Sequence, residues 1–354
     1  MRLSMKALGR GLVTGICFVG MSAGALGADA VKVFVLAGQS NMEGKVQNKL
    51  LEHQARDEKT KAIFAHLRDG DEWVVRDDVW VKFLDKSGGL SIGYGSRDRT
   101  GVELEFGHVL GGKFEEPVLL IKTCWGGHSL YKLFRSPSAG MPSDETLAAE
   151  LEKAQANVKK RNEKNGKDDP LPTMDDIREV YGSSYRNMMT EVEETMANAG
   201  DLFPKLKGKK LEIAGFVWHQ GWNDQYNGAE VEYASNMEHL INDVRKDFGV
   251  EELPVVVAVM GQNGSKEPKG AMKVIQDAQM AMEKVPAFVG NVKAVRTDVL
   301  TDKAAEALYP KWRDNFEEWE KTGSDRGYHY LGSAIWHVRM GHEFADAMLG
   351  LMGE

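Results

Sequence analysis

The chain has 354 residues, of which 42% are hydrophobic and 28% charged, and its formal net charge is −8. Such a composition can bury a sizeable core. The acidic balance argues against nucleic acid or an anionic membrane as a partner, since both repel negative charge.

The first 27 residues have the features of a secretory signal peptide. Arg2, Lys6 and Arg10 give a positive start, an apolar and Gly-rich stretch follows over 11–26, and small residues at Ala25 and Gly27 suit a signal peptidase. The apolar stretch is too short for a membrane span. We therefore predict cleavage after Gly27, export to the periplasm or medium, and one mature domain over residues 28–354.

The mature chain would be more acidic and almost free of cysteine. Removing residues 1–27 takes away three cations and no anions, so the net charge falls from −8 to −11. Only Cys124 remains, and an intramolecular disulfide is therefore impossible. An exported chain without disulfides fits a bacterial periplasm.

Five apolar, β-branched runs predict buried strands. They are separated by helix-length segments, which is typical of a parallel sheet covered on both faces. The runs cover residues 31–37, 117–121, 211–218, 254–260 and 292–297. The sequence thus predicts an α/β fold with a five-stranded parallel sheet.

Helices are expected between and after these strands. Apolar residues recur at helical spacing over 181–196 and over 231–244, and residues 331–349 form a closing helix. Two insertions, at about 45–100 and 135–178, lie outside this plan. The second holds a charged helix over 145–160 and a loop over 162–172. Such segments either wall a site or decorate the surface.

The carboxyl ends of parallel strands meet at one edge of a sheet, where ligands bind. The first strand leads to Ser40, the second to Gly126, the third to Asn223, and His329 precedes the last helix. Acyl transfer needs this inventory of nucleophile, base and oxyanion donors. We predict Ser40 as the nucleophile and His329 as its base. The oxyanion donors would be the Ser40 and Gly126 N–H groups and the Asn223 amide.

These segments resemble the SGNH hydrolases, and within them the sialate O-acetylesterase and acetylxylan esterase group (carbohydrate esterase family 6-like). The resemblance rests on Gly-Gln-Ser-Asn-Met over 38–42, Gly126-Gly127, Trp-His-Gln-Gly-x-Asn-Asp over 218–224, and His329. It implies a flavodoxin-like three-layer α/β/α sandwich, no metal or other cofactor, and hydrolysis of acetyl esters, commonly on sugars.

Two positions depart from the pattern of that group. Trp222 stands where the third block usually has Glu. The last block usually has Asp three residues before the histidine, but that position is Arg326 here, and the nearest acid is Asp325, four residues before. We assign Asp325 as the acid that orients His329. Asp298 or a backbone carbonyl are the alternatives.

Neighbouring residues are assigned to substrate binding or to structure. Gln39, Gln220, Gly127, Trp125 and Trp222 are expected to bind substrate, the two tryptophans because aromatic faces suit pyranose rings; packing in the core is the alternative for them. Packing or hydrogen bonding is expected for the remaining polar residues of these segments, His128, His219 and Asp224. No His/Cys cluster has metal-ligand spacing.

The sequence therefore predicts a serine O-acetylesterase whose partner is an acetylated carbohydrate. A non-catalytic carbohydrate-binding protein on the same fold and a hydrolase of lipid or thioester acyl chains are the alternatives. The particular sugar, its acetylated position and the oligomeric state are left open.

Overall fold

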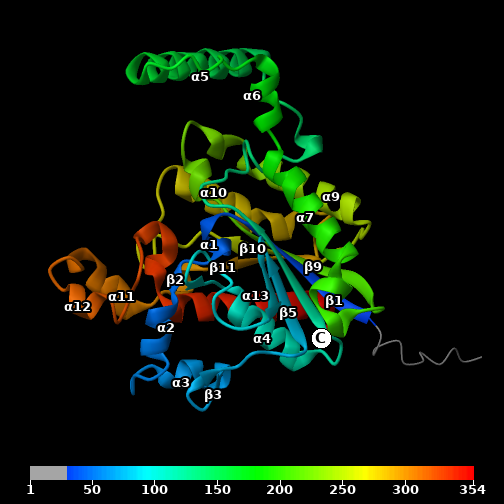
Figure 1. The fold of residues 1–354 in the computed structure, drawn as a ribbon, viewed down its shortest axis with the longest axis vertical. Coiled ribbons are helices and arrows are strands. Elements are labelled where there is room, and N and C mark those ends of the chain that lie inside the picture. Colours follow the sequence, from blue (N-terminus) through cyan, green and yellow to red (C-terminus); the bar gives the residue numbers. More distant parts are fainter. Residues whose placement is uncertain (1–29) are drawn as a thin grey trace, which may run out of the picture.

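The computed structural model describes residues 30–354. The predicted signal peptide, residues 1–27, lies outside the described residues. Seven strands form the central sheet in the order β11-β10-β9-β1-β8-β5-β6 (Figure 1). Their bounds are β1 Ala30–Gly38, β5 Val79–Phe83, β6 Lys86–Gly89, β8 Val118–Cys124, β9 Lys210–His219, β10 Val255–Val259 and β11 Val292–Arg296.

The five predicted strands are all present, as β1, β8, β9, β10 and β11, and every neighbouring pair among them is parallel. In order along the chain these strands lie 2-1-3-4-5 across the sheet, the doubly wound order of flavodoxin-like folds.

The sheet has seven strands rather than the five expected. β5 pairs parallel with β8, and β6 pairs antiparallel with β5 at the edge. Both strands come from the 45–100 insertion. The apolar run of β5 is short and lies between charged residues, Arg76 to Asp78 before it and Asp85 and Lys86 after it. This run therefore does not stand out from the rest of the insertion in the sequence.

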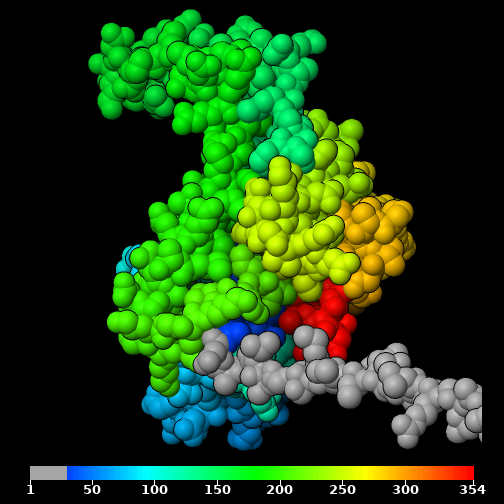
Figure 2. All heavy atoms as spheres, turned by 90° about the vertical axis from the view of Figure 1, so that its right-hand side faces the viewer, coloured from blue at the N-terminus to red at the C-terminus, as the bar shows by residue number. Residues whose placement is uncertain are grey.

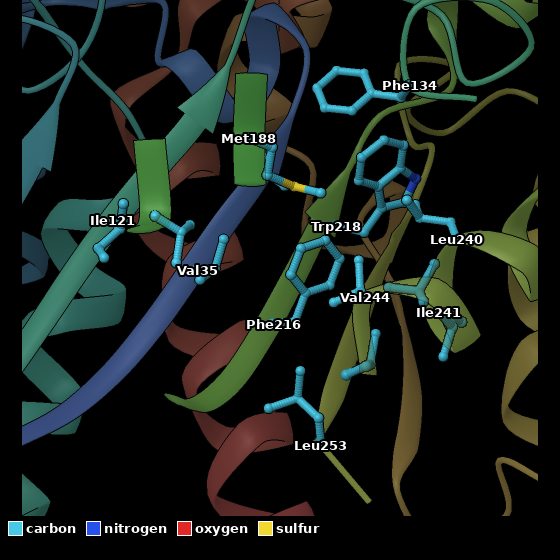
Figure 3. Packing of buried hydrophobic residues seen from close by; sticks show 14 of the residues in the cluster. Val35, Ile121, Phe134, Met188, Phe216, Trp218, Leu240, Ile241, Val244 and Leu253 are labelled. Atoms are coloured by element: carbon cyan, nitrogen blue, oxygen red, sulfur yellow. The ribbon is translucent and has the colours of Figure 1, made fainter. Parts of the chain in front are cut away.

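Two hydrophobic layers cover the sheet, and alternate residues of each strand point to opposite faces. On one face Val33, Val35, Ile121 and other side chains pack against α7 (Ser183–Ala197), α9 (Tyr233–Phe248) and α10 (Ala271–Ala281) (Figure 3). On the other face α4 (Glu103–Lys113) and α13 (Ala334–Met352) cover Phe34 and Leu36. The molecule is therefore the predicted three-layer α/β/α sandwich.

The other helices and strands are mostly short, apart from α5. The helices are α1 Ser40–Glu43, α2 Asn48–Gln54, α3 Lys61–Phe64, α5 Asp144–Asn165, α6 Met174–Val180, α8 Ala199–Leu202, α11 Lys303–Leu308 and α12 Phe316–Trp319. The short strands are β2 Val46–Gln47, β3 Arg68–Asp69, β4 Glu72–Trp73 and β7 Arg99–Thr100. The 3₁₀ turns nearest the site are η4 Trp222–Gln225, η5 Ala229–Glu232 and η9 Gly327–Gly332.

The predicted helices agree with the structure except at their ends. Val231, expected on the buried face of a helix, lies in η5 and is 79% exposed, and the helix itself begins at Tyr233. The closing helix begins at Ala334 rather than Leu331, because Tyr330 and Leu331 take left-handed backbone angles. The charged helix of the second insertion runs on to Asn165, into the predicted loop.

The second insertion forms an arm. α5 lies across one end of the molecule and is joined to the body through α6, so that most of its length stands clear of the sandwich (Figures 1 and 2). Over residues 30–354, no helix is both long and apolar enough to cross a membrane.

Candidate active site

Ser40 lies at the point where β1 turns into α1. Gly38 ends the strand with φ +148°, and a Cβ on it would lie only 2.2 Å from the carbonyl oxygen of His219 on β9. Glycine is required for this close approach. Gln39 N then donates to that same carbonyl at 3.2 Å, and Ser40 begins α1 with 6% of its surface exposed. The hydroxyl is thus held at the carboxyl edge of the sheet.

His329 meets Ser40 at this edge. The Oγ atom of Ser40 lies 2.9 Å from Nε2 of His329, although the two residues are 289 positions apart in the sequence. On the other side of the ring, Nδ1 of His329 lies 3.2 Å from Oδ1 of Asp325. The ring N–H is not aligned with that oxygen, so the contact has ion-pair distance without hydrogen-bond geometry. Such contacts commonly tighten only with substrate bound.

The turn around His329 allows an acid four residues earlier to reach its ring. The carbonyl of Leu331 accepts from the N–H groups of both Ser324 and Asp325, at 2.9 and 3.0 Å, which closes a loop over 324–331. Tyr330 and Leu331 have φ of +50° and +62°, which is costly for residues with a side chain. The buried hydroxyl of Tyr330 accepts from Gly261 N at 3.1 Å, and this bond ties the turn to the end of β10.

Asp325 is held on both carboxylate oxygens. Oδ1 accepts from the Arg326 N–H at 2.7 Å, and Oδ2 forms an ion pair with the guanidinium of Arg99 on β7. Burial acts to raise the pKa of this carboxyl. The opposing effects of His329, the Arg326 N–H and Arg99 are larger, so the pKa of Asp325 lies below its usual range. The carboxylate is therefore ionised at neutral pH.

Asp298, the alternative acid, is engaged elsewhere. Its two oxygens accept from the guanidinium of Arg296 at 2.6 and 2.5 Å. Among the described residues, the carboxylate within ion-pair distance of His329 belongs to Asp325.

Gly126, one of the expected oxyanion donors, lies next to Ser40, and its neighbour Gly127 lies next to Asn223. A Cβ on Gly126 would lie 3.9 Å from Cβ of Ser40, and one on Gly127, which has φ +80°, would lie 3.8 Å from Nδ2 of Asn223. Gln39 orients the asparagine, since its Nε2 donates to Oδ1 of Asn223 and its Oε1 accepts from Asn223 N, both at 3.4 Å. The Nδ2 group of Asn223 is thereby left directed away from Gln39.

Two residues assigned to substrate binding are engaged inside the protein. Gln39 and Gln220 are each 2% exposed. Nε2 of Gln220 donates to the His128 carbonyl at 3.0 Å and to Asp224 at 2.6 Å, while its Oε1 accepts from the Tyr233 hydroxyl. Both glutamines are therefore buried, and the polar ends of their side chains form hydrogen bonds with other protein groups.

The remaining polar residues of these segments pack as expected. Oxygens of the buried Asp224 accept from Leu130 N and Tyr131 N at 2.9 and 2.7 Å, which joins the loop after β9 to the loop after β8. Burial lowers the pKa of His219 to about 3, and its Nε2 lies 3.3 Å from the Tyr330 hydroxyl. His128 contacts the hydroxyl of Ser184 at 2.6 Å.

Aromatic side chains flank the Ser40–His329 pair. The rings of Trp222 and Tyr328 lie 5.9 Å apart, and the ring of Tyr328 also lies 4.5 Å from that of His329. Trp222 is partly exposed and Tyr328 is 43% exposed. Trp125 is also partly exposed, stacks on His128 and packs against the tilted ring of Phe134. Trp222 and Tyr328 thus offer apolar ring surface next to the hydroxyl.

Sequence reasoning missed two charged groups that support the site. Arg99 comes from the first insertion and contacts Asp325, as described above. Lys122, on β8, is buried with Glu103 at 2.8 Å and donates to the carbonyl of Glu43 at 3.0 Å, the last residue of α1. Lys122 could have been noticed in the sequence, because a lysine inside the apolar run of a buried strand requires a partner for its charge.

The geometry permits nucleophilic acyl transfer. A hydroxyl lies within hydrogen-bond distance of an imidazole, the imidazole lies beside an ionised carboxylate, and a glycine pair and an amide lie next to the hydroxyl. Within residues 30–354, no group of three or more His, Cys, Asp or Glu side chains is arranged to hold a metal ion.

Comparison with known proteins identifies the class. Residues 30–166 and 173–307 match the profile of the family described as carbohydrate esterase, sialic acid-specific acetylesterase. The chain belongs to this family and is therefore a carboxylic ester hydrolase. The match includes Ser40, Gly126 and Asn223 and ends before Asp325 and His329. A search of curated proteins gives no match.

Solved structures align with the chain at low sequence identity. A carbohydrate acetylesterase from Xanthomonas citri, XAC1771, aligns with a TM-score of 0.50 and 15% identity, over 91% of this chain and 57% of that one. The Arabidopsis thaliana protein AT4G34215 aligns with a TM-score of 0.49 and 15% identity, over 91% of this chain and 98% of that one. NanS aligns with a TM-score of 0.40 and 13% identity, over 79% and 80%.

Proposed function

We propose that the protein is a serine esterase that removes O-acetyl groups from carbohydrates, with Ser40 as nucleophile, His329 as general base and Asp325 as the orienting acid. The observation that carries the proposal is the 2.9 Å approach of Ser40 Oγ to His329 Nε2. The ionised Asp325 on the far side of the ring supports it. Membership of the carbohydrate esterase family supports the acetylated sugar as substrate.

In the first half of the reaction Ser40 becomes acetylated. His329 Nε2 takes the hydroxyl proton as Ser40 Oγ attacks the acetyl carbonyl carbon, and Asp325 stabilises the imidazolium that forms. The carbonyl oxygen gains a negative charge, which the N–H groups of Ser40 and Gly126 and the Asn223 amide would stabilise. The tetrahedral intermediate then expels the sugar oxygen, which takes the proton from His329.

The second half regenerates the enzyme. Water enters the place that the sugar alcohol has left, gives a proton to His329 and attacks the acetyl-serine carbonyl. The same donors stabilise the second oxyanion. Collapse of this intermediate breaks the bond to Ser40 Oγ, which recovers its proton from His329, and acetate is released.

Ser40→Ala tests the assignment. The variant should fold as the wild type does and lose nearly all acetate release from O-acetylated sugars and from p-nitrophenyl acetate, since it lacks the hydroxyl that forms the proposed acyl-enzyme. Ser87→Ala, at an exposed serine of β6, is the matched control and should retain activity. Circular dichroism reports the fold, and acetate release reports the rate.

The same assays decide against the competing functions. If Ser40→Ala retains more than a few per cent of wild-type activity, Ser40 is not the nucleophile. If the wild type binds O-acetylated sugars but hydrolyses neither these nor p-nitrophenyl acetate, the protein is a carbohydrate-binding protein on this fold. Release of long-chain acyl groups in preference to acetate would favour a lipid or thioester hydrolase.

A further inference from the structure

The arm and the body enclose a groove that reaches the oxyanion donor Asn223. The groove has a volume of about 740 Å³, within the usual range for small-molecule sites. One wall is the first half of α5, from Glu145 to Asn157, and the other is the segment from Asn223 to Ala229. The floor comes from the loop after β8, Ser129 to Lys132. The groove therefore starts at Asn223, in the loop after β9, and leads away from it under the arm.

α5 contributes little to the hydrophobic core. Of its 22 residues, Leu147 alone is buried. Such an exposed helix gains almost no stability from packing, so the core does not account for its presence. Figure 2 shows the arm standing off the body. What the arm does provide is one side of the groove.

The base of the arm is nevertheless firmly attached. Leu147, Ile177 and Tyr181 form a small hydrophobic cluster between α5, α6 and the body. Glu150 of α5 pairs with Lys132 and accepts a hydrogen bond of 2.7 Å from the Tyr181 hydroxyl. These contacts fix the α5 wall relative to the floor, so the groove is a preformed surface.

The chemistry of the walls suits a neutral sugar chain. Side-chain amides of Asn157, Asn223 and Asn227 offer hydrogen-bond donors and acceptors, and the exposed ring of Tyr226 offers an apolar face for a pyranose. Two lysines and two glutamates also line the groove, so their charges cancel. An anionic chain would find no excess of positive charge there.

We propose that this groove binds the sugar residues next to the acetylated one, so that the substrate is a neutral O-acetylated oligosaccharide or polysaccharide rather than a single sugar. The inference rests on the proposed esterase function of Ser40. It assigns Tyr226 and Asn157, on opposite walls, to substrate binding, and it gives the second insertion the role of a substrate-binding wall.

The test measures kcat/KM on O-acetylated xylose oligomers of one to five residues and on p-nitrophenyl acetate. In the wild type kcat/KM should rise by about 10-fold or more from one residue to three, because binding energy from neighbouring sugars can be used at the reacting centre. In Tyr226→Ala and Asn157→Ala the ratio of kcat/KM on the trimer to that on p-nitrophenyl acetate should fall by about 3- to 10-fold.

The control is Phe316→Ala, which removes an equally exposed aromatic ring on α12, away from the groove. It should leave the ratio unchanged. The proposed role of the groove would be wrong if the enzyme is active but its kcat/KM does not depend on oligomer length. It would also be wrong if neither groove substitution lowers the ratio of kcat/KM on the trimer to that on p-nitrophenyl acetate. Either result would leave the proposed esterase function standing. A higher kcat/KM on O-acetylated oligomers of an acidic sugar would overturn the neutral-chain assignment. Failure to hydrolyse p-nitrophenyl acetate would instead overturn the proposed function.

Discussion

At the scale of single residues, the orientation of His329 depends on one carboxylate that other groups hold in place. Asp325 lies 3.2 Å from Nδ1 of the ring, while Arg326 N donates to its Oδ1 and the Arg99 guanidinium contacts its Oδ2. These contacts leave the carboxylate few orientations other than the one that faces the ring. Its low pKa keeps it ionised, as the proposed mechanism requires when an imidazolium forms beside it.

Asp325→Asn should lower kcat by roughly 10- to 10,000-fold with little change in KM, because the amide cannot stabilise the imidazolium and favours the wrong ring tautomer. Asp298→Asn is the comparison, and it should stay within a few-fold of wild-type kcat, since Asp298 is paired with Arg296. Steady-state kinetics on p-nitrophenyl acetate measures both. A crippled Asp298→Asn beside a normal Asp325→Asn would transfer the acid role to the end of β11.

The sequence pattern selects residues that share a sheet edge, but not those that only the folded chain brings together. Ser40, Asn223 and His329, whose roles stay predictions, could be named because each follows or precedes an element that ends at this edge. Gln220 stands in the same motif and is predicted to bind substrate, while in the structure its neighbours enclose it. Arg99 was not found, because only the folded first insertion brings it to Asp325, 226 positions away.

At the scale of elements, the turn over 324–331 shows what the sequence pattern leaves out. An acid four residues before His329, rather than three, reaches the ring because two consecutive residues take positive φ and the Leu331 carbonyl closes the loop. Backbone angles of this kind at Tyr330 and Leu331 follow from tertiary contacts, not from local preference. From the sequence, Asp325 could be assigned as the group that orients His329 only with Asp298 and a backbone carbonyl as alternatives.

The loops after β8 and β9 are joined by a buried carboxylate with a perturbed pKa. Burial raises the pKa of Asp224 to about 6, an effect that outweighs its hydrogen bonds from Gln220 and from the N–H groups of Tyr131 and Leu130. Between about pH 4 and pH 6 the folded state therefore binds a proton that the unfolded state has released. The stability from this proton is fully present below about pH 4 and is lost as the pH rises through 6.

Asp224→Asn should remove this pH dependence. By linkage the wild type loses about 2 kcal/mol of unfolding free energy at this group between pH 4 and pH 7, whereas the variant is uncharged at both. The excess of wild-type over variant stability should therefore be larger at pH 4 than at pH 7, as measured by urea unfolding. Asp314→Asn, at an exposed position, controls for the loss of one negative charge. An excess that is constant, or that grows with pH, would contradict the raised pKa.

At the scale of the whole molecule, the sheet could be predicted from its five apolar runs, β1, β8, β9, β10 and β11, but not on the side formed by β5 and β6. β5 is buried but short and lies between charged residues, so its apolar run does not stand out in the sequence. β6, with the sequence Lys-Ser-Gly-Gly, has no such run and depends on pairing with β5. The arm formed by the second insertion was recognisable as a charged helix, but its place beside Asn223 depends on the fold.

The order of the chain also bears on the proposed export of the protein. β1 lies between β8 and β9 in the middle of the sheet, and it begins at Ala30, two residues beyond the expected cleavage site after Gly27. Cleavage there would leave every residue of β1 in place. Val31 and Val33 are fully buried, so each contributes about 1.5–3 kcal/mol, a large part of a typical unfolding free energy of about 5–15 kcal/mol.

A chain that starts at Ala28 should therefore match the exported protein in melting temperature and in kcat/KM, while a chain that starts at Phe34 should fail to fold. The second truncation removes both buried valines and the backbone pairing of residues 30–33 with β9. It therefore leaves a gap in the middle of the sheet. Circular dichroism melting and acetate release compare the two truncations, and N-terminal sequencing of the exported protein should begin at Ala28. Export with Met1 still present would contradict the signal peptide, and a stable, active chain from Phe34 would contradict the structural role of the start of β1.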